Sequence, residues 1–162
     1  MNRKLYLIRH SYAEPPGSKD DFDRKLTHEG QTVVRALGRE LLNQSFKANK
    51  IYCSSAVRTR ETATNLLEEL GMNGHVVDYL DVIYNASVRE LLAVVNEAEK
   101  AYKEIAIIGH NPAITYFGEY LTGEGIGNME PSSIVTIRFI KQDWSAVSQG
   151  TGEFVSYYHP ST

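Results

Sequence analysis

The sequence predicts an α/β fold: a three-layer α/β/α sandwich whose central sheet is mostly parallel, with a possible antiparallel strand at one edge. Two observations lead to this prediction. Up to Leu121, short apolar runs alternate with longer segments whose apolar residues recur at helical spacing, as in parallel strands covered by helices. Beyond the glycines at positions 123, 125 and 127, two runs alternate apolar and polar residues, which is typical of antiparallel strands. Because 162 residues can bury one substantial core, we expect residues 1–162 to form a single domain.

The first half of the chain contains two strand and helix pairs and a third, weaker strand. Thr27 is a residue type that caps helices, because its hydroxyl can accept a hydrogen bond from a free backbone N–H of the first turn. Gly71 is suited to end a helix. The expected elements are a strand at 3–8, a helix at 27–42, a strand at 50–53, a helix from about Ala56 to Gly71 and a strand at 75–79.

The second half begins with another helix and the most apolar strand of the chain. Ser87 is placed to open the helix, and Pro112 suits the first turn of the helix that follows the strand. The two final runs are separated by Gly150 and Gly152 and can pair as an antiparallel edge. The expected elements are a helix from Ser87 into the charged stretch 97–103, a strand at 105–108, a helix at 112–121 and strands at 134–140 and 154–158.

Composition excludes several classes of function. A net charge of −3 and a pI near 6 argue against a nucleic-acid partner, which requires a clustered basic face. The start of the chain lacks the apolar run of a signal peptide and no segment is long enough to span a membrane, so we expect a cytoplasmic protein without a membrane partner. The single Cys53 cannot form an internal disulfide, and its apolar neighbours favour a buried side chain over a thiol nucleophile.

Polar residues follow three of the predicted strands at the point where each strand ends. Arg9 and His10 follow the first strand, residues 54–58 follow the second, and His110 follows the most apolar one. Ligands of open α/β sheets bind at the carboxyl ends of the strands, so we expect these side chains to face one crevice. An arginine can donate two hydrogen bonds to phosphate oxygens, and a histidine changes its protonation state near neutral pH. The pattern therefore favours a phosphate site.

Four ordered segments make this pattern more specific: residues 7–10, 23–30, 54–63 and 108–112. With them the chain resembles the histidine phosphatase superfamily, which is built around an Arg-His-Gly signature and includes the phosphoglycerate mutases. The chain is most similar to the short branch of SixA-type phosphohistidine phosphatases. The matching segments cover most of the first 120 residues in the family's order. The resemblance implies a phosphoglycerate mutase-like fold and a single histidine phosphatase domain.

The resemblance also implies roles for individual residues. His10 would attack phosphorus through a ring nitrogen, giving a phosphohistidine intermediate that water hydrolyses, and it must be neutral to do so. Arg9, Arg58 and His110 would surround the phosphoryl group and stabilise charge on its oxygens. Neither a cofactor nor a metal ion is implied.

Arg58 and His110 each have a structural alternative as well. Arg58 can be a solvated helix residue, although the first turn of a helix disfavours a cation and a bound anion would explain its position. His110 can be satisfied by the backbone of a strand-to-helix turn. A metal site built from His10, His110 and His75 is conceivable, but no carboxylate pattern accompanies it.

Two departures from the family pattern concern the site. The glycine that usually follows the nucleophile is Ser11, which we expect to narrow the pocket or to add a hydroxyl contact. Mutase-like members carry a glutamate shortly before a Tyr-Gly pair, and alignment of that pair with Tyr84 and Asn85 places Asp81 at the position of the general acid. Asp81 is one methylene shorter than glutamate, and a role in organising the turn before Tyr84 is an equal alternative.

The short link 71–74 bears on the substrate, because larger members of the family insert a lid there. We expect an open pocket, suited to a phosphorylated side chain on another protein. Residues 17–21 are expected near its mouth, joined by 124–128 if that loop folds back. Either their negative charge selects the partner, or both segments are ordinary solvated loops.

The leading hypothesis is a phosphatase acting on phosphohistidine in a signalling or phosphotransfer protein. The alternatives are a phosphatase or mutase of small phosphate esters that uses Asp81 as the acid, and a non-catalytic phosphate-binding domain. The intact set of His10, Arg9, Arg58 and His110 speaks against the last of these. The sequence does not indicate an oligomeric state.

Overall fold

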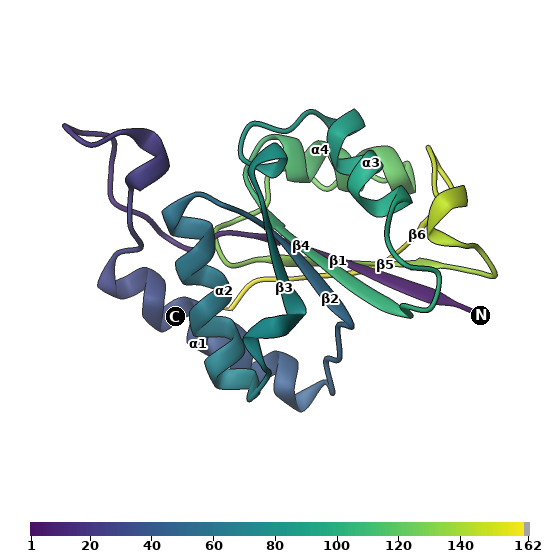
Figure 1. Ribbon diagram of the computed structural model, residues 1–162, viewed down its shortest axis with the longest axis horizontal. Coiled ribbons are helices and arrows are strands. Elements are labelled where there is room, and N and C mark those ends of the chain that lie inside the picture. The colour runs from purple at the N-terminus through teal and green to yellow at the C-terminus, as the bar shows by residue number, and fades with distance from the viewer. Residues whose placement is uncertain (161–162) are drawn as a thin grey trace.

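A six-stranded sheet forms the centre of the protein, and two helices cover each of its faces (Figure 1). The computed structural model describes residues 1–160, so the last two positions of the expected domain lie outside the described residues. The strands are β1 (Arg3–Arg9), β2 (Lys50–Ser54), β3 (Val77–Leu80), β4 (Glu104–Gly109), β5 (Ile134–Phe139) and β6 (Glu153–Tyr158). The α-helices are α1 (His28–Asn43), α2 (Val57–Leu70), α3 (Val88–Asn96) and α4 (Ala113–Thr122).

The strand order is β3-β2-β4-β1-β5-β6. The first four strands are parallel to one another, β5 runs antiparallel to β1, and β6 runs antiparallel to β5. This confirms the predicted α/β/α sandwich with a mostly parallel sheet. The two final strands pair with each other in antiparallel fashion, as the sequence predicted. Residues 134–139 also pair with β1 and so lie inside the sheet, where β6 forms one edge and β3 the other.

The helices divide the core between the two faces of the sheet. Alternate side chains of β1, such as Ile8 and Leu7, point to opposite faces, as the period of a strand requires. Ile8 belongs to the cluster that α1 and α2 cover, and Leu7 belongs to the cluster that α3 and α4 cover. The central strands are apolar on both faces because both faces are buried.

Local signals set most helix ends. The hydroxyl of Thr27 accepts a hydrogen bond from the backbone N–H of Gly30 at 2.9 Å, and Gly71 ends α2 in the left-handed conformation with φ at 65°. Ser87 and Glu90 form a reciprocal capping box at the start of α3. These three boundaries were predicted from the sequence.

Other boundaries differ from the prediction. Helix α3 ends at Asn96, so the charged stretch 97–103 is a connection and not the last turns of the helix. The third strand begins at Val77, because residues 74–76 form a short 3₁₀ turn. The link 71–74 is short, as expected.

The register between strands positions the site. Ile8 lies opposite Ile108 and Arg9 opposite Gly109, so β1 and β4 end at the same level. Cys53 of β2 also lies opposite Ile108. The segments that follow these three strands therefore leave the sheet side by side.

No helix within residues 1–160 is long and apolar enough to cross a membrane. The side chain of Cys53 is fully buried in the cluster beneath α1 and α2, as the sequence predicted.

Adjacent leucines of α1 test the division between core and surface. Leu41 is 3% exposed and packs in the core, whereas Leu42 is 54% exposed. Leu41→Ala should lower the free energy of unfolding by about 2–5 kcal/mol, because it removes buried methyl groups and leaves a cavity. Leu42→Ala, the matched control, should change it by no more than about 0.5 kcal/mol. Urea denaturation measures both values, and equal losses would contradict this assignment of the core.

Candidate active site

The carboxyl ends of β1, β2 and β4 bring the predicted phosphate-binding residues to one cavity of about 350 Å³. Arg9 ends β1 and His10 follows it, His110 follows β4, and Arg58 lies in the first turn of α2, just beyond β2. The ring centroids of His10 and His110 are 5.3 Å apart. The cavity is also lined by Asp21, Arg24, Tyr84, Asn85 and Asn111.

His10 is held as a neutral ring with one nitrogen free. Its side chain is 9% exposed, and Nδ1 lies 2.7 Å from the carbonyl oxygen of Ser11. Because a carbonyl oxygen only accepts hydrogen bonds, Nδ1 carries the proton and Nε2 keeps its lone pair. Burial, joined by the charges of Arg58 and Arg9 and opposed by the hydrogen bond to Ser11, lowers the pKa of His10 to about 4. At neutral pH the ring therefore has the state that a nucleophile needs.

His110 is the second neutral imidazole of the cavity. Its Nε2 lies 2.7 Å from the hydroxyl oxygen of Ser54, which already accepts the backbone N–H of Ala56. When the Ser54 hydroxyl donates its proton to Nε2, the proton of His110 is carried by Nδ1. Burial, followed by the nearby His10 and Arg58, lowers the pKa of His110 to about 3. Nδ1 is buried and has no hydrogen-bond partner among residues 1–160.

Arg9 and Arg58 supply fixed positive charge. Arg9 donates from Nη1 to the carbonyl oxygen of Met129 at 2.8 Å, and burial lowers its pKa from the usual value. Arg58 is 6% exposed, so it is not the solvated helix residue of the alternative hypothesis. The Nε atoms of both arginines are buried without a partner in the described part of the chain.

Asp21 provides the negative charge that faces Arg58. Arg58 donates from Nη1 to the carbonyl oxygen of Asp21 at 2.7 Å and from Nη2 to its carboxylate at 3.0 Å. The carboxylate also accepts hydrogen bonds from the Tyr84 hydroxyl at 2.6 Å and from Arg24 at 2.6 Å. The Tyr84 hydrogen bond, joined by those from Arg24 and Arg58, holds the pKa of Asp21 well below its usual range. A cation in the first turn of α2 thus faces an acidic residue of this same chain.

Asp21 is carried by a closed loop beyond the carboxyl end of β1 (Figure 1). Ala13 and Leu26 pair at the base of the loop, and the Glu14 N–H donates to the carbonyl oxygen of Lys25 at 2.8 Å. The sequence predicted that residues 17–21 lie near the mouth, and Asp21 does line the cavity. The second predicted loop also folds back, because Asn128 accepts a hydrogen bond from Asn111 at 2.9 Å.

Asp81 lies outside the set of residues that line the cavity. Its side chain is exposed, and its carboxylate accepts a hydrogen bond from the Ser55 hydroxyl. Its carbonyl oxygen accepts the backbone N–H of Tyr84 at 3.0 Å, which closes a 3₁₀ turn. This geometry favours the turn-organising alternative over the general acid.

Ser11 does not act on the pocket in either of the ways expected from the sequence. Its side chain is fully buried, and its hydroxyl donates to the carbonyl oxygen of Gly30 at 2.7 Å. The expectation of a narrower pocket or a hydroxyl contact was therefore wrong, because the side chain points at the first turn of α1. A Cβ at Gly30 would lie 2.1 Å from the Tyr12 carbonyl oxygen, so the close approach of the Tyr12 backbone to α1 needs glycine at position 30.

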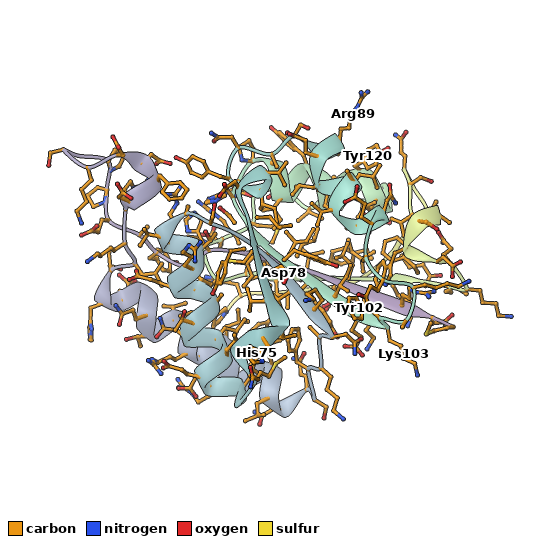
Figure 2. The ribbon with its side chains drawn as sticks, viewed as in Figure 1. His75, Asp78, Arg89, Tyr102, Lys103 and Tyr120 are labelled. Carbon is orange, nitrogen blue, oxygen red and sulfur yellow. The ribbon has the colours of Figure 1, made fainter. Side chains whose placement is uncertain are left out.

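The hypothesis of a three-histidine metal site was wrong. His75 lies at the amino end of β3 (Figure 2), whereas His10 and His110 follow the carboxyl ends of strands parallel to it. Within residues 1–160, no group of three or more His, Cys, Asp or Glu side chains is arranged to hold a metal ion.

The sequence did not identify Asp21, Arg24 and Tyr84 as a connected group of the cavity. Arg24 and Tyr84 appeared only in matched or aligned segments, and Asp21 only in a loop. The available signal was an acidic residue three positions before an arginine, within a loop that joins a strand to a helix. Only the fold shows that Arg58 and Tyr84 reach the same carboxylate.

Comparison with known proteins identifies the family. The family model described as "Histidine phosphatase superfamily (branch 1)" matches residues 5–91, which is more than half of the chain. The chain belongs to the histidine phosphatase superfamily. This confirms both the family predicted from the four sequence segments and the prediction of a phosphatase enzyme. A curated relative, an uncharacterised protein of Mycobacterium leprae, is 26% identical, and the match covers 94% of this chain and 99% of the relative.

Two solved structures share the fold along nearly their whole length. The structure from Nakamurella multipartitia is 24% identical with a TM-score of 0.83, covering 100% of this chain and 98% of that one. The structure from Agrobacterium tumefaciens is 21% identical with a TM-score of 0.84, covering 98% of both chains. Both carry the name "putative phosphohistidine phosphatase SixA". The predicted phosphoglycerate mutase-like fold is confirmed.

The protonation state of His10 can be tested directly by NMR. As the pH falls, the ring should stay neutral through 6.5, the ordinary pKa of histidine, and become protonated with a midpoint near 4, because burial disfavours the charged form. Long-range ¹H–¹⁵N spectra should place the proton of the neutral ring on Nδ1, the atom that faces the Ser11 carbonyl oxygen. A midpoint at or above 6.5, or a neutral ring protonated on Nε2, would contradict this description.

Proposed function

We propose that this protein is a metal-independent phosphatase that forms a phosphohistidine intermediate on His10 and acts on phosphohistidine in a signalling or phosphotransfer protein. The observation that carries the proposal is the state of His10: a buried neutral ring with Nδ1 tied to the Ser11 carbonyl and Nε2 free, in a cavity with two arginines. In this proposal residues 1–162 work as one catalytic domain.

The first displacement uses the lone pair on Nε2 of His10. That nitrogen attacks phosphorus, the bond from phosphorus to the leaving group breaks, and the phosphoryl group is held as phosphohistidine until water hydrolyses it. The Ser11 carbonyl oxygen stabilises the positive charge that develops on the ring, because it accepts the hydrogen bond of Nδ1–H. Two easier steps thus replace one hard displacement.

Arg9, Arg58 and His110 stabilise the transferring phosphoryl group. The buried Nε atoms of both arginines and Nδ1 of His110 have no partner within residues 1–160, and all three side chains line the cavity. Buried polar groups normally have partners, so these atoms are suited to a ligand that supplies acceptor oxygens. Donors fixed in advance around the phosphoryl oxygens lower the barrier, and one such donor contributes roughly 10²–10³ in rate at comparable oxyanion sites.

Three observations support a protein-borne phosphohistidine as the substrate. The link 71–74 carries no lid, and Asp21 at the edge of the cavity is 52% exposed. An imidazole leaves more readily than an alkoxide, so the reaction does not require a general acid. This agrees with the position of Asp81, which is not among the residues that line the cavity. A further solved neighbour, a protein histidine phosphatase SixA complexed with tungstate, has a TM-score of 0.79 at 22% identity.

The second candidate function is a phosphatase or mutase of small phosphate esters. It requires Asp81 to protonate an alkoxide leaving group, which means that the carboxylate must leave Ser55 and enter the cavity. Its supporting observation is the position of Asp81 three residues before Tyr84, which lines the cavity.

The two functions are separated by turnover of a phosphohistidine carrier protein and of a panel of sugar phosphates. We expect the carrier protein to have the higher kcat/KM, and Asp81→Asn to retain turnover of it within about threefold, because no proton from Asp81 is needed. His10→Ala should abolish phosphate release from every substrate, since the nucleophile is lost. His28→Ala removes an exposed histidine of α1 and serves as the matched control.

Two results would contradict the proposal. Faster turnover of sugar phosphates, lost in Asp81→Asn, would establish the second candidate function. Phosphate release that survives in His10→Ala would exclude the phosphohistidine intermediate on His10, which both candidate functions require.

A further inference from the structure

We propose that Asp21 is a specificity-determining residue, whose carboxylate accepts a hydrogen bond from the distal ring nitrogen of the substrate phosphohistidine. The distal nitrogen is the imidazole nitrogen that is not bonded to phosphorus. The site then prefers phosphoryl groups carried by a protonated imidazole over those carried by an alcohol. This inference rests on the proposed function and adds to it the chemical feature by which the substrate is selected.

The position of Asp21 suits contact with a leaving group. His10 lies at the bottom of the cavity, 9% exposed, and Asp21 lies on the same cavity with a side chain that is 52% exposed. In an in-line displacement the leaving group departs on the side of phosphorus opposite to the nucleophile. The proposal places the departing imidazole on the exposed side of this cavity, beside Asp21, because the side chain of Asp21 is far more exposed than His10.

The carboxylate has room for one more donor. A carboxylate has about four lone-pair sites. Three are used by the Tyr84 hydroxyl, Arg24 and Arg58 in hydrogen bonds of 2.6, 2.6 and 3.0 Å. These bonds hold the carboxylate in place before substrate arrives, and its exposed part remains accessible to a donor from outside.

The groups lining the cavity supply no proton to a leaving group at neutral pH. Asp21 is ionised, because the hydrogen bonds from Tyr84, Arg24 and Arg58 lower its pKa. Tyr84 donates its proton to Asp21, and this hydrogen bond raises the pKa of Tyr84. His10 and His110 are both neutral in the free protein. A leaving group must therefore depart without a proton from these side chains.

A phosphohistidine whose distal ring nitrogen is protonated meets that requirement. Nε2 of His10 forms a bond to phosphorus, the bond from phosphorus to the substrate nitrogen breaks, and its electron pair stays on that nitrogen. The substrate ring keeps the proton on its distal nitrogen and leaves as neutral imidazole. Asp21 favours this form by accepting the distal N–H and by stabilising the positive charge of the protonated ring.

The same carboxylate disfavours phosphate esters of alcohols. Such a substrate brings a dianionic phosphoryl group and no positive charge, so the negative charge of Asp21 opposes its binding. Any phosphoryl group shares the Arg58 guanidinium with Asp21, because Arg58 donates to Asp21 from Nη1 and Nη2. Only the protonated imidazole brings a positive charge that offsets the repulsion from the carboxylate.

Asp21→Asn keeps the size of the side chain and removes its charge, which makes it the test. We measure kcat/KM for a phosphohistidine carrier protein and for p-nitrophenyl phosphate, whose leaving group needs no proton. Turnover of the carrier protein should fall at least about tenfold, since a hydrogen bond between charged groups is lost. Turnover of p-nitrophenyl phosphate should rise, and inorganic phosphate should inhibit more strongly, because a repulsive charge is gone.

Asp23→Asn is the matched control, because it makes the same charge change on an exposed residue of the same loop and should affect neither substrate. Retained p-nitrophenyl phosphate turnover also shows that the Asp21 variant is folded. Equal losses on both substrates would overturn the inference and make Asp21 a residue that only positions Arg58, and unchanged turnover of both would also overturn it. A wild-type protein that hydrolyses p-nitrophenyl phosphate but not phosphohistidine would overturn the proposed function, and the inference with it.

Discussion

Parallel pairing of β1 with β4 is the constraint on which the site depends. It sets Arg9 opposite Gly109, so His10 and His110 leave adjacent strands at the same level and their rings lie 5.3 Å apart. The pairing is fixed by side chains buried on both faces of the two strands, where a shift of one residue would exchange the faces. The stability of the core and the geometry of the nucleophile are thus set by the same register.

A small number of side chains sets the distribution of charge in the cavity. His10 and His110 are neutral because burial and the nearby arginines disfavour their protonation. The positive charge therefore resides on arginines, whose planar groups suit phosphate. Asp21 neutralises part of that charge through Arg58 and Arg24. In the inference drawn above, it also binds the imidazole that carries the phosphoryl group.

The sequence predicted what depends on local chemistry. Caps such as Thr27 and Gly71 act within one turn, and the strand ends that carry His10 and His110 follow from apolar runs. Interactions between distant segments were not visible. Arg3 is 2% exposed because it donates to the carbonyl oxygens of Gln142 and Lys100, 139 and 97 positions away. The contact of Arg58 with Asp21 spans 37 positions. Ser11 is a local case that failed, because the direction of its side chain depends on how α1 packs.

The central claim is that Nε2 of His10 receives the phosphoryl group, and trapping the intermediate tests it most directly. The protein is mixed rapidly with a phosphorylated substrate, quenched in alkali, in which phosphoramidates survive, and digested for mass spectrometry. The account predicts a phosphoryl group on the peptide that contains His10, bonded to Nε2 because Nδ1 faces the Ser11 carbonyl oxygen. A phosphoryl group on any other side chain, or substrate turnover with inversion of configuration at phosphorus and no adduct, would contradict it.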